Sequence, residues 1–92
     1  MNTSKLFLDE YYINLFRELD DDEVIRIELI NDNKIYFLPS DEFYPDSPMI
    51  IIIKPIKDKR QKIIIDVNAI AVICTMSRET YDLKLNRGEL YV

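Results

Sequence analysis

The densest apolar pattern in the chain lies between residues 49 and 75. It begins with the run 49–53 and continues in two further apolar stretches, 62–65 and 69–75. β-Branched residues at this density, bounded by charged and turn-forming residues, predict strands rather than a helix. Because residues 49–53 are apolar at odd and even positions alike, we expect both faces of this strand to be covered, by the core and by the N-terminal helix or another chain.

The N-terminal third of the chain has the pattern of a helix followed by a hairpin. Apolar residues recur at helical spacing across residues 4–19, with Ser4 as the expected N-cap. Residues 24–30 alternate at their centre, and residues 34–38 return as a second strand. The Asn and Asp residues at 31–33 favour a tight turn between the two strands.

Two segments are less regular. Residues 39–48 contain three of the four prolines, so we expect one long irregular loop there. Phe43 and Tyr44 lie in this loop, where they would bind a partner or fold back to cap the mouth of a small β-barrel, and we favour the cap. In residues 76–92 the sole glycine separates short apolar stretches and predicts a C-terminal β-hairpin. The expected fold is one mainly β domain, 1–92, with an N-terminal α-helix and five strands within 24–75.

Composition narrows the classes of protein. At 92 residues, 48% hydrophobic and 32% charged, the chain fits a single soluble globular domain. No apolar stretch approaches the roughly 18 residues of a membrane span, and the N-terminus lacks a signal-peptide layout. The single cysteine, Cys74, has no partner for an intrachain disulfide and is expected to act as a small buried hydrophobe. We therefore expect a cytoplasmic protein without membrane contacts.

Charge is unevenly distributed along the chain. Residues 1–46 carry four basic and twelve acidic residues, whereas residues 47–92 carry eight basic and five acidic ones, which predicts a dipolar surface. An acidic run follows the predicted helix, where negative charge opposes the helix dipole. We favour a solvated linker there over an acidic contact surface, and the run lacks the glycine and ligand spacing of a calcium loop. It consists of Asp20, Asp21, Asp22 and Glu23.

The basic residues concentrate between the third and fourth predicted strands. A lysine-rich hairpin tip usually serves solubility and protects a sheet edge, and we favour that interpretation over contacts with phosphate. The cluster consists of Lys54, Lys57, Lys59, Arg60 and Lys62.

The predicted elements follow the order found in Sm-like proteins, which is a helix and then five short strands, with a tight turn before the last strand. Residues 24–34 resemble the first Sm strand and its turn, and 41–43 resemble the acidic-aromatic step after the second strand. Residues 65–73 are similar to the second Sm motif in the form found in the bacterial RNA chaperone Hfq. The resemblance covers residues 4–75 and implies a small five-stranded SH3-like barrel, formed by 24–75, that assembles into rings.

The departures from this family concern its RNA site. Hfq has Tyr-Lys-His at the positions occupied here by Asp66, Val67 and Asn68, and the Arg-Gly of eukaryotic and archaeal Sm proteins is absent. Only Asn68 matches their base-contacting asparagine. Because a carboxylate repels a phosphate backbone, this substitution argues against nucleic acid as the partner.

The sequence also lacks most catalytic chemistry. It contains no histidine and only one glycine, so we expect no enzyme, no cofactor and no metal site. We favour a non-enzymatic Sm-like module for protein interaction and self-assembly, with other copies of the chain or a basic protein as partners. One alternative is an acidic inhibitor or immunity-type protein, encoded by a phage or a low-GC bacterium, that blocks a basic nucleic-acid-binding groove. The other is an Hfq-like RNA binder that uses Lys57, Lys59, Arg60 and Lys62.

Overall fold

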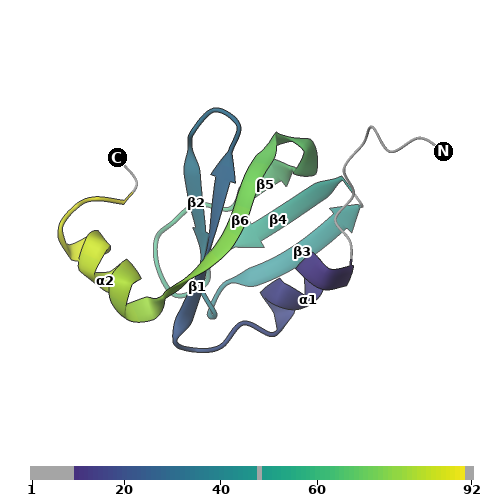
Figure 1. Cartoon of the computed structure of the whole chain (residues 1–92). Coiled ribbons are helices and arrows are strands. Elements are labelled where there is room, and N and C mark those ends of the chain that lie inside the picture. The colour runs from purple at the N-terminus through teal and green to yellow at the C-terminus, as the bar shows by residue number, and fades with distance from the viewer. Residues whose placement is uncertain (1–9, 48, 91–92) are drawn as a thin grey trace.

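In a computed structural model, which describes residues 10–47 and 49–90, the chain forms two three-stranded antiparallel sheets and two α-helices (Figure 1). The predicted fold class, mainly β with an N-terminal helix, is confirmed. The elements in chain order are α1 (Glu10–Arg17), β1 (Glu23–Leu29), β2 (Lys34–Phe37), β3 (Glu42–Ser47), β4 (Ile50–Lys54), β5 (Ile63–Asp66), the 3-10 turn η1 (Val67–Ala69), β6 (Ile70–Ser77) and α2 (Arg78–Asn86).

The first sheet has the strand order β2-β1-β6 and contains the predicted β1–β2 hairpin. The turn places Asp32 at φ 72°, in the left-handed region that Asn and Asp tolerate best among residues other than glycine. The Asn31 side chain supports the turn by accepting the Asn33 N–H at 3.1 Å. The short polar sequence between two apolar strands therefore folded as its composition predicts.

The second sheet has the order β3-β4-β5, and its first strand corrects the sequence prediction. Residues 39–48 do not form one irregular loop, because Glu42–Ser47 pair with β4. Pro45 is tolerated there because β3 is an edge strand, where a missing N–H leaves no ladder bond unmade. The described residues thus form six strands where five were predicted. In the described residues no strand of one sheet pairs with a strand of the other, so the structure has two sheets and not a closed barrel.

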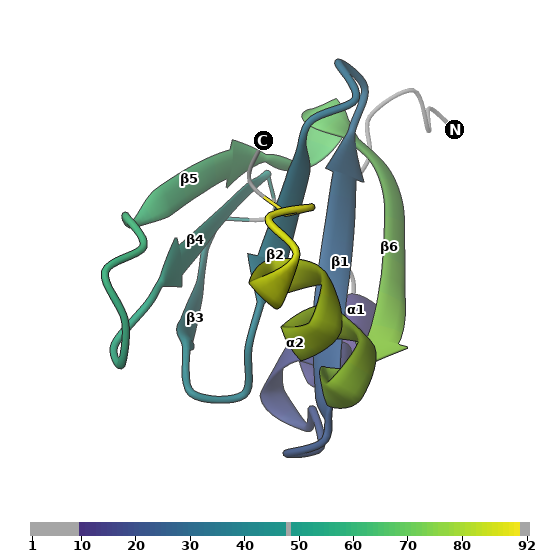
Figure 2. The same cartoon turned by 90° about the vertical axis from the view of Figure 1, so that its left-hand side faces the viewer.

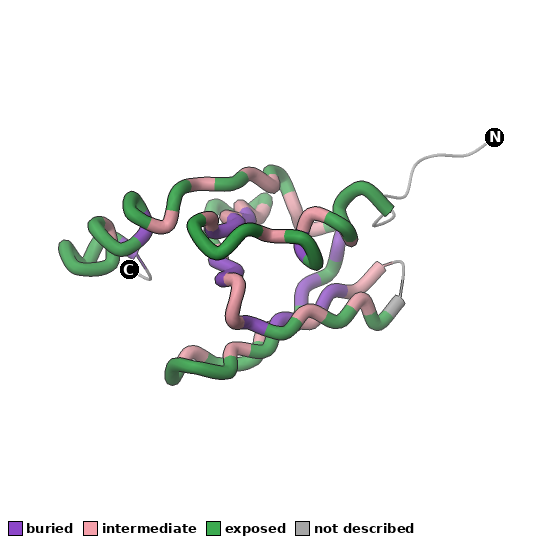
Figure 3. Tube along the Cα trace, turned by 90° about the horizontal axis from the view of Figure 1, so that it is seen from below, coloured by how far each residue is buried: buried purple, intermediate pink, exposed green. Residues whose placement is uncertain are grey.

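The main core lies between the two sheets and beneath α1. Figure 3 shows the buried segments gathered at the centre of the molecule, with exposed loops around them. Phe16 is the buried residue of α1 and packs on a cluster contributed by β1, β2, β4, β5 and η1. This cluster contains Ile25, Ile27, Phe37, Ile51, Ile53, Ile65 and Val67. Of the predicted helix 4–19, residues 4–9, including Ser4, lie outside the described part of the chain.

The C-terminal hairpin prediction is wrong, because residues 78–86 form α2. This helix lies against the face of the first sheet that points away from α1 (Figure 2). Its Tyr81 and the following Leu90 are buried in a second, smaller cluster with Val24, Tyr36 and Leu38. The Ser77 hydroxyl caps the helix by accepting the Thr80 N–H at 3.1 Å.

The two faces of the second sheet differ in their exposure. On the inner face, Ile51 and Ile53 are fully buried, in agreement with the predicted core strand. On the outer face, Ile52 is only half-buried and Ile64 is 62% exposed. The expectation that the N-terminal helix would cover this second face is wrong, because α1 packs on the inner side through Phe16. Cover by another chain stays a prediction.

Candidate functional site

Arg60, which we considered as a contact for phosphate, is held inside the protein. Its guanidinium group donates to the Asp41 carboxylate at 2.6 Å, to the Tyr36 carbonyl at 3.0 Å and to the Asp58 carboxylate at 2.9 Å. The Asp41 side chain is completely buried and also accepts the Leu38 N–H at 2.9 Å. Arg60 therefore ties the β4–β5 connection to the bend between β2 and β3, which is a structural role.

The lysines around Arg60 lie on the surface. Lys54, Lys57, Lys59 and Lys62 are all exposed, and none forms an ion pair within residues 10–47 and 49–90. The nearest acidic residue in the sequence, Asp58, is already paired with Arg60. The β4–β5 connection thus presents uncompensated positive charge on a chain whose net charge is −5.

The acidic run does not form a uniformly negative surface. Asp20, Asp21 and Asp22 are exposed, whereas Glu23 begins β1 and lies opposite Ser77. Asp21 lines a hollow of about 540 Å³ together with the cations Lys57 and Arg78. Folding therefore places basic residues of the second half of the sequence beside acidic residues of the first half, so the predicted dipole between the two halves does not hold at this end of the molecule.

Phe43 and Tyr44 point to opposite faces of β3. The Phe43 ring stacks on Phe16 with their centroids 4.3 Å apart, so Phe43 packs on the core from strand β3 and not from a loop that folds back. Tyr44 faces outward and is 46% exposed. Cross-strand pairing places it beside Ile52, which in turn pairs with Ile64. We call Tyr44, Ile52 and Ile64 the outer row.

The positions equivalent to the Sm RNA site form a compact turn. The Asp66 carboxylate accepts the Asn68 N–H at 2.9 Å and so caps η1. Val67 is buried, and its N–H donates to the Met49 carbonyl at 2.8 Å. Asp66 and Val67 thus have structural contacts that explain their residue types without any ligand.

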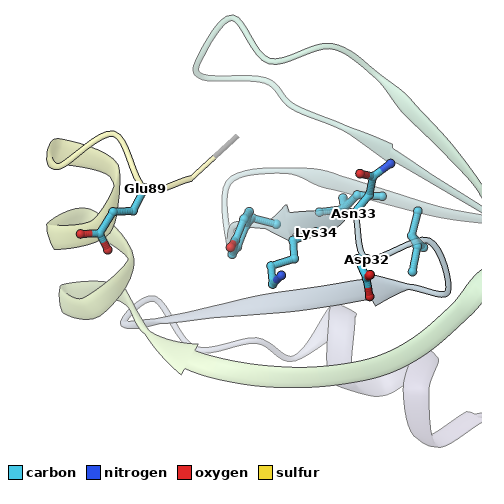
Figure 4. Close-up of a pocket in the computed structure, with 7 residues that line it drawn as sticks. Asp32, Asn33, Lys34 and Glu89 are labelled. Atoms are coloured by element: carbon cyan, nitrogen blue, oxygen red, sulfur yellow. The ribbon is translucent and has the colours of Figure 1, made fainter. Parts of the chain in front are cut away.

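Another hollow lies between the β1–β2 turn and the segment after α2. It measures about 370 Å³ and has Leu29, Ile35 and Tyr36 in its lining. Figure 4 shows Glu89 on one side, Asp32 and Asn33 on the other, and Lys34 between them. The charged groups do not converge on one point, so this hollow has no arrangement typical of catalysis.

Among the described residues, strand β6 is the longest strand and has a neighbour on one side only, β1. Its eight residues, IAVICTMS, include neither a charged residue nor a proline. Val72 is 43% exposed, and Cys74 is half-buried opposite Arg26. Sequence reasoning predicted this strand but not its edge position, which depends on which strands pair.

Two tyrosines have perturbed acidities. Burial raises the pKa of Tyr36, an effect that the nearby positive charge of Arg26 partly offsets. The hydrogen bond that the Tyr44 hydroxyl donates to Glu42 raises the pKa of Tyr44. Burial and a single hydrogen bond to Glu42 account for these two shifts, and neither shift by itself identifies a catalytic site.

The described residues contain neither a cluster of metal ligands nor a helix that could span a membrane. Within 10–47 and 49–90, His, Cys, Asp and Glu form no group of three or more that could hold a metal ion. None of the helices in the same ranges is long and apolar enough to cross a membrane. No protein-family model, curated protein or solved structure matches the chain.

Proposed function

We propose that this protein is a non-enzymatic, Sm-like module, an open β-barrel of two sheets, that binds proteins and assembles with copies of itself. The observation that carries the proposal is the edge strand β6, eight residues long and free of charge and proline. Folded proteins normally protect such edges with lysine, proline, bulges or short strands. Strand β6 has a bulge opposite Glu28 and Leu29, but from Val72 to Ser77 it pairs in regular register and carries neither lysine nor proline, so this part of the edge is suited to pairing with another strand.

The arrangement of elements supports the Sm-like part of the proposal. The β2 and β3 strands are separated only by the bend at residues 38–41, and β2 pairs with β1 while β3 pairs with β4. Counted as one bent strand, they reduce the six strands to the five of the Sm order. The η1 turn then precedes the last strand, as in that order.

The mode of assembly follows from the free edges. In the strand orders β2-β1-β6 and β3-β4-β5, both β5 and β6 are outer strands. Pairing of β6 with β5 of the next copy is heterologous, and such contacts form rings when the rotation closes. The short β5, preceded by Lys62, would be the protected partner and β6 the receptive one.

Native mass spectrometry of wild-type protein and two variants tests the proposal. Wild type should give a closed oligomer, and Val72→Lys should shift it to monomer because a charge on the β6 edge opposes strand pairing. Ile30→Lys is the matched control, since Ile30 is 71% exposed and lies outside β6. A wild-type protein that stays monomeric at high micromolar concentration would refute self-assembly.

One observation supports a second candidate function, that of an acidic inhibitor. Asp20, Asp21 and Asp22 are exposed and form no ion pair in the part of the chain that the structure describes. Reversal of these three charges to lysine should slow association with a basic partner strongly at low salt and weakly at high salt. An unchanged association rate would exclude this function.

A further inference from the structure

The outer face of the second sheet combines exposed apolar side chains with free positive charge. The outer row, Tyr44, Ile52 and Ile64, crosses all three strands in register. Lys54 ends β4 on the same face as Ile52, because side chains alternate along a strand. Lys62 immediately precedes β5. One end of the row is therefore bordered by two cations, Lys54 at the end of β4 and Lys62 just before β5.

The charge balance around the row favours a negatively charged partner. Residues 54–62 contain five basic residues and one acidic residue, on a chain of net charge −5. At the lysine end of the face the carboxylate is Glu42, which lies opposite Lys54 and accepts a hydrogen bond from the Tyr44 hydroxyl, whereas Asp46 and Asp66 lie at the other end, near Ile50. The lysines have no ion pair in the described residues, so they are the groups free to bind an incoming charge.

The side chains of the outer row suit a peptide better than a nucleic acid. Unspecific binding of single strands uses aromatic side chains on which bases stack, together with arginine. Two of the three members of the row are isoleucines, and the local arginine, Arg60, is engaged with Asp41 and Asp58. Aliphatic side chains instead complement leucine, isoleucine or valine of another protein.

A second copy of this chain is a poorer occupant of the face. Three strands about 4.8 Å apart and five residues long give a face of roughly 14 by 17 Å. A face of this size is smaller than the roughly 800 Å² per partner that a stable interface buries. It is well matched to one short segment.

We propose that the outer row and its bordering lysines bind a short acidic segment of a partner protein that carries apolar side chains between its carboxylates. The apolar side chains of this segment cover Ile52 and Ile64, and its carboxylates lie near Lys54 and Lys62. This surface is distinct from the β6 edge and does not depend on self-assembly.

Fluorescence anisotropy with labelled peptides of about eight residues, a length typical of a β-strand, tests the proposal. The probe is a peptide of alternating glutamate and leucine. One comparison peptide replaces glutamate with lysine, and another replaces leucine with serine. Each should bind at least about tenfold more weakly than the probe, because each removes one of the two complementary features.

Variants of the protein locate the site. Ile64→Ser should lower the affinity for the probe about tenfold. Ile56→Ser should leave the affinity unchanged, because Ile56 is 51% exposed but lies after β4 and outside the outer row. Lys54→Glu with Lys62→Glu should weaken the acidic probe and strengthen binding of the lysine–leucine peptide. Val72→Lys, which disturbs the β6 edge, should leave probe binding intact whatever it does to assembly.

Several results would overturn the proposal. They are the absence of probe binding at millimolar concentration, equal binding of the serine peptide, and equal binding of the lysine–leucine peptide. Tighter binding of a short oligouridine, lost in the Lys54→Glu, Lys62→Glu variant, would assign the surface to nucleic acid instead. A wild-type protein that binds the probe but stays monomeric at high micromolar concentration would refute self-assembly alone.

Discussion

Replacing Arg60 by alanine should destabilise the protein more than replacing any exposed basic residue. The Asp41 side chain is fully buried and the Arg60 side chain is 15% exposed, with 2.6 Å between their nitrogen and oxygen atoms. Removing Arg60 leaves a buried carboxylate with one remaining described partner, the Leu38 N–H. Breaking a buried ion pair in this way typically costs about 3–5 kcal/mol.

This loss is large for a small protein. Stability of about 0.05–0.15 kcal/mol per residue gives about 5–14 kcal/mol for 92 residues. Urea unfolding followed by circular dichroism measures the change, with an m value of about 1 kcal/mol/M for a domain of this size. Loss of 3 kcal/mol then lowers the unfolding midpoint by about 3 M, provided that m is unchanged.

Arg87→Ala is the matched control. Arg87 pairs with Glu89 at 3.9 Å, and both side chains are largely exposed, so its removal should change the stability by less than about 0.5 kcal/mol. Asp41→Asn should fall between the two, because the amide oxygen can still accept the Leu38 N–H. A loss below about 1 kcal/mol for Arg60→Ala would refute the structural role of this residue and restore it as a candidate for ligand contacts.

Three further changes probe the helices and the buried tyrosine. Phe16→Ala should lower the unfolding free energy by about 3–5 kcal/mol in urea titrations, because Phe16 is 3% exposed and stacks on Phe43. Ser77→Ala should reduce thermal stability by about 1 kcal/mol through loss of the α2 N-cap, and Ser77→Asp should restore it. Burial raises the pKa of Tyr36. The stability that comes from keeping this hydroxyl protonated is therefore complete below about pH 10 and is lost as the pH rises through the folded-state pKa. Tyr36→Phe should flatten this alkaline loss of stability, measured as urea midpoints over a series of pH values.

The first part of the fold could be predicted because its determinants are local. Alternation across residues 24–30 and the polar turn at 31–33 specify a hairpin, and the structure has Asp32 in the left-handed conformation that such a turn uses. The helical spacing that predicts α1 is equally local, and Phe16 from that stripe is buried as expected. Patterns within about ten residues were sufficient for these elements.

The C-terminal helix was missed because two local signals compete there. Leucines at 83 and 85 alternate with a lysine and suggested a strand. The decisive signals were the boundaries: Ser77 caps the helix, and Gly88 follows it at φ 70°. Burial of Tyr81 and Leu90 against the β1–β2 hairpin then stabilises the helix, and this contact joins residues more than 40 positions apart.

Strand β3 was missed for a related reason. Prolines argue against a central strand, and only the sheet order shows that β3 is an edge where Pro45 is tolerated. The role of Arg60 was equally hidden, because its partner Asp41 lies 19 residues earlier, at a bend whose burial no local pattern predicts. Both failures concern which segments meet, and not what each segment prefers.

The role of Arg60 also separates the candidate functions. Of the five basic residues in 54–62, Arg60 is the one suited to bidentate phosphate contacts, and it is bound to Asp41 and Asp58. Of the four lysines left on the surface, Lys54 and Lys62 are point charges beside the outer row, and this combination complements carboxylates and apolar side chains better than stacked bases. If Arg60 is structural, a lysine variant that loses affinity should remain as stable as wild type, whereas Arg60→Ala should lose stability first. Measuring stability and binding on the same variants therefore distinguishes a ligand contact from a folding contact at every position of the cluster.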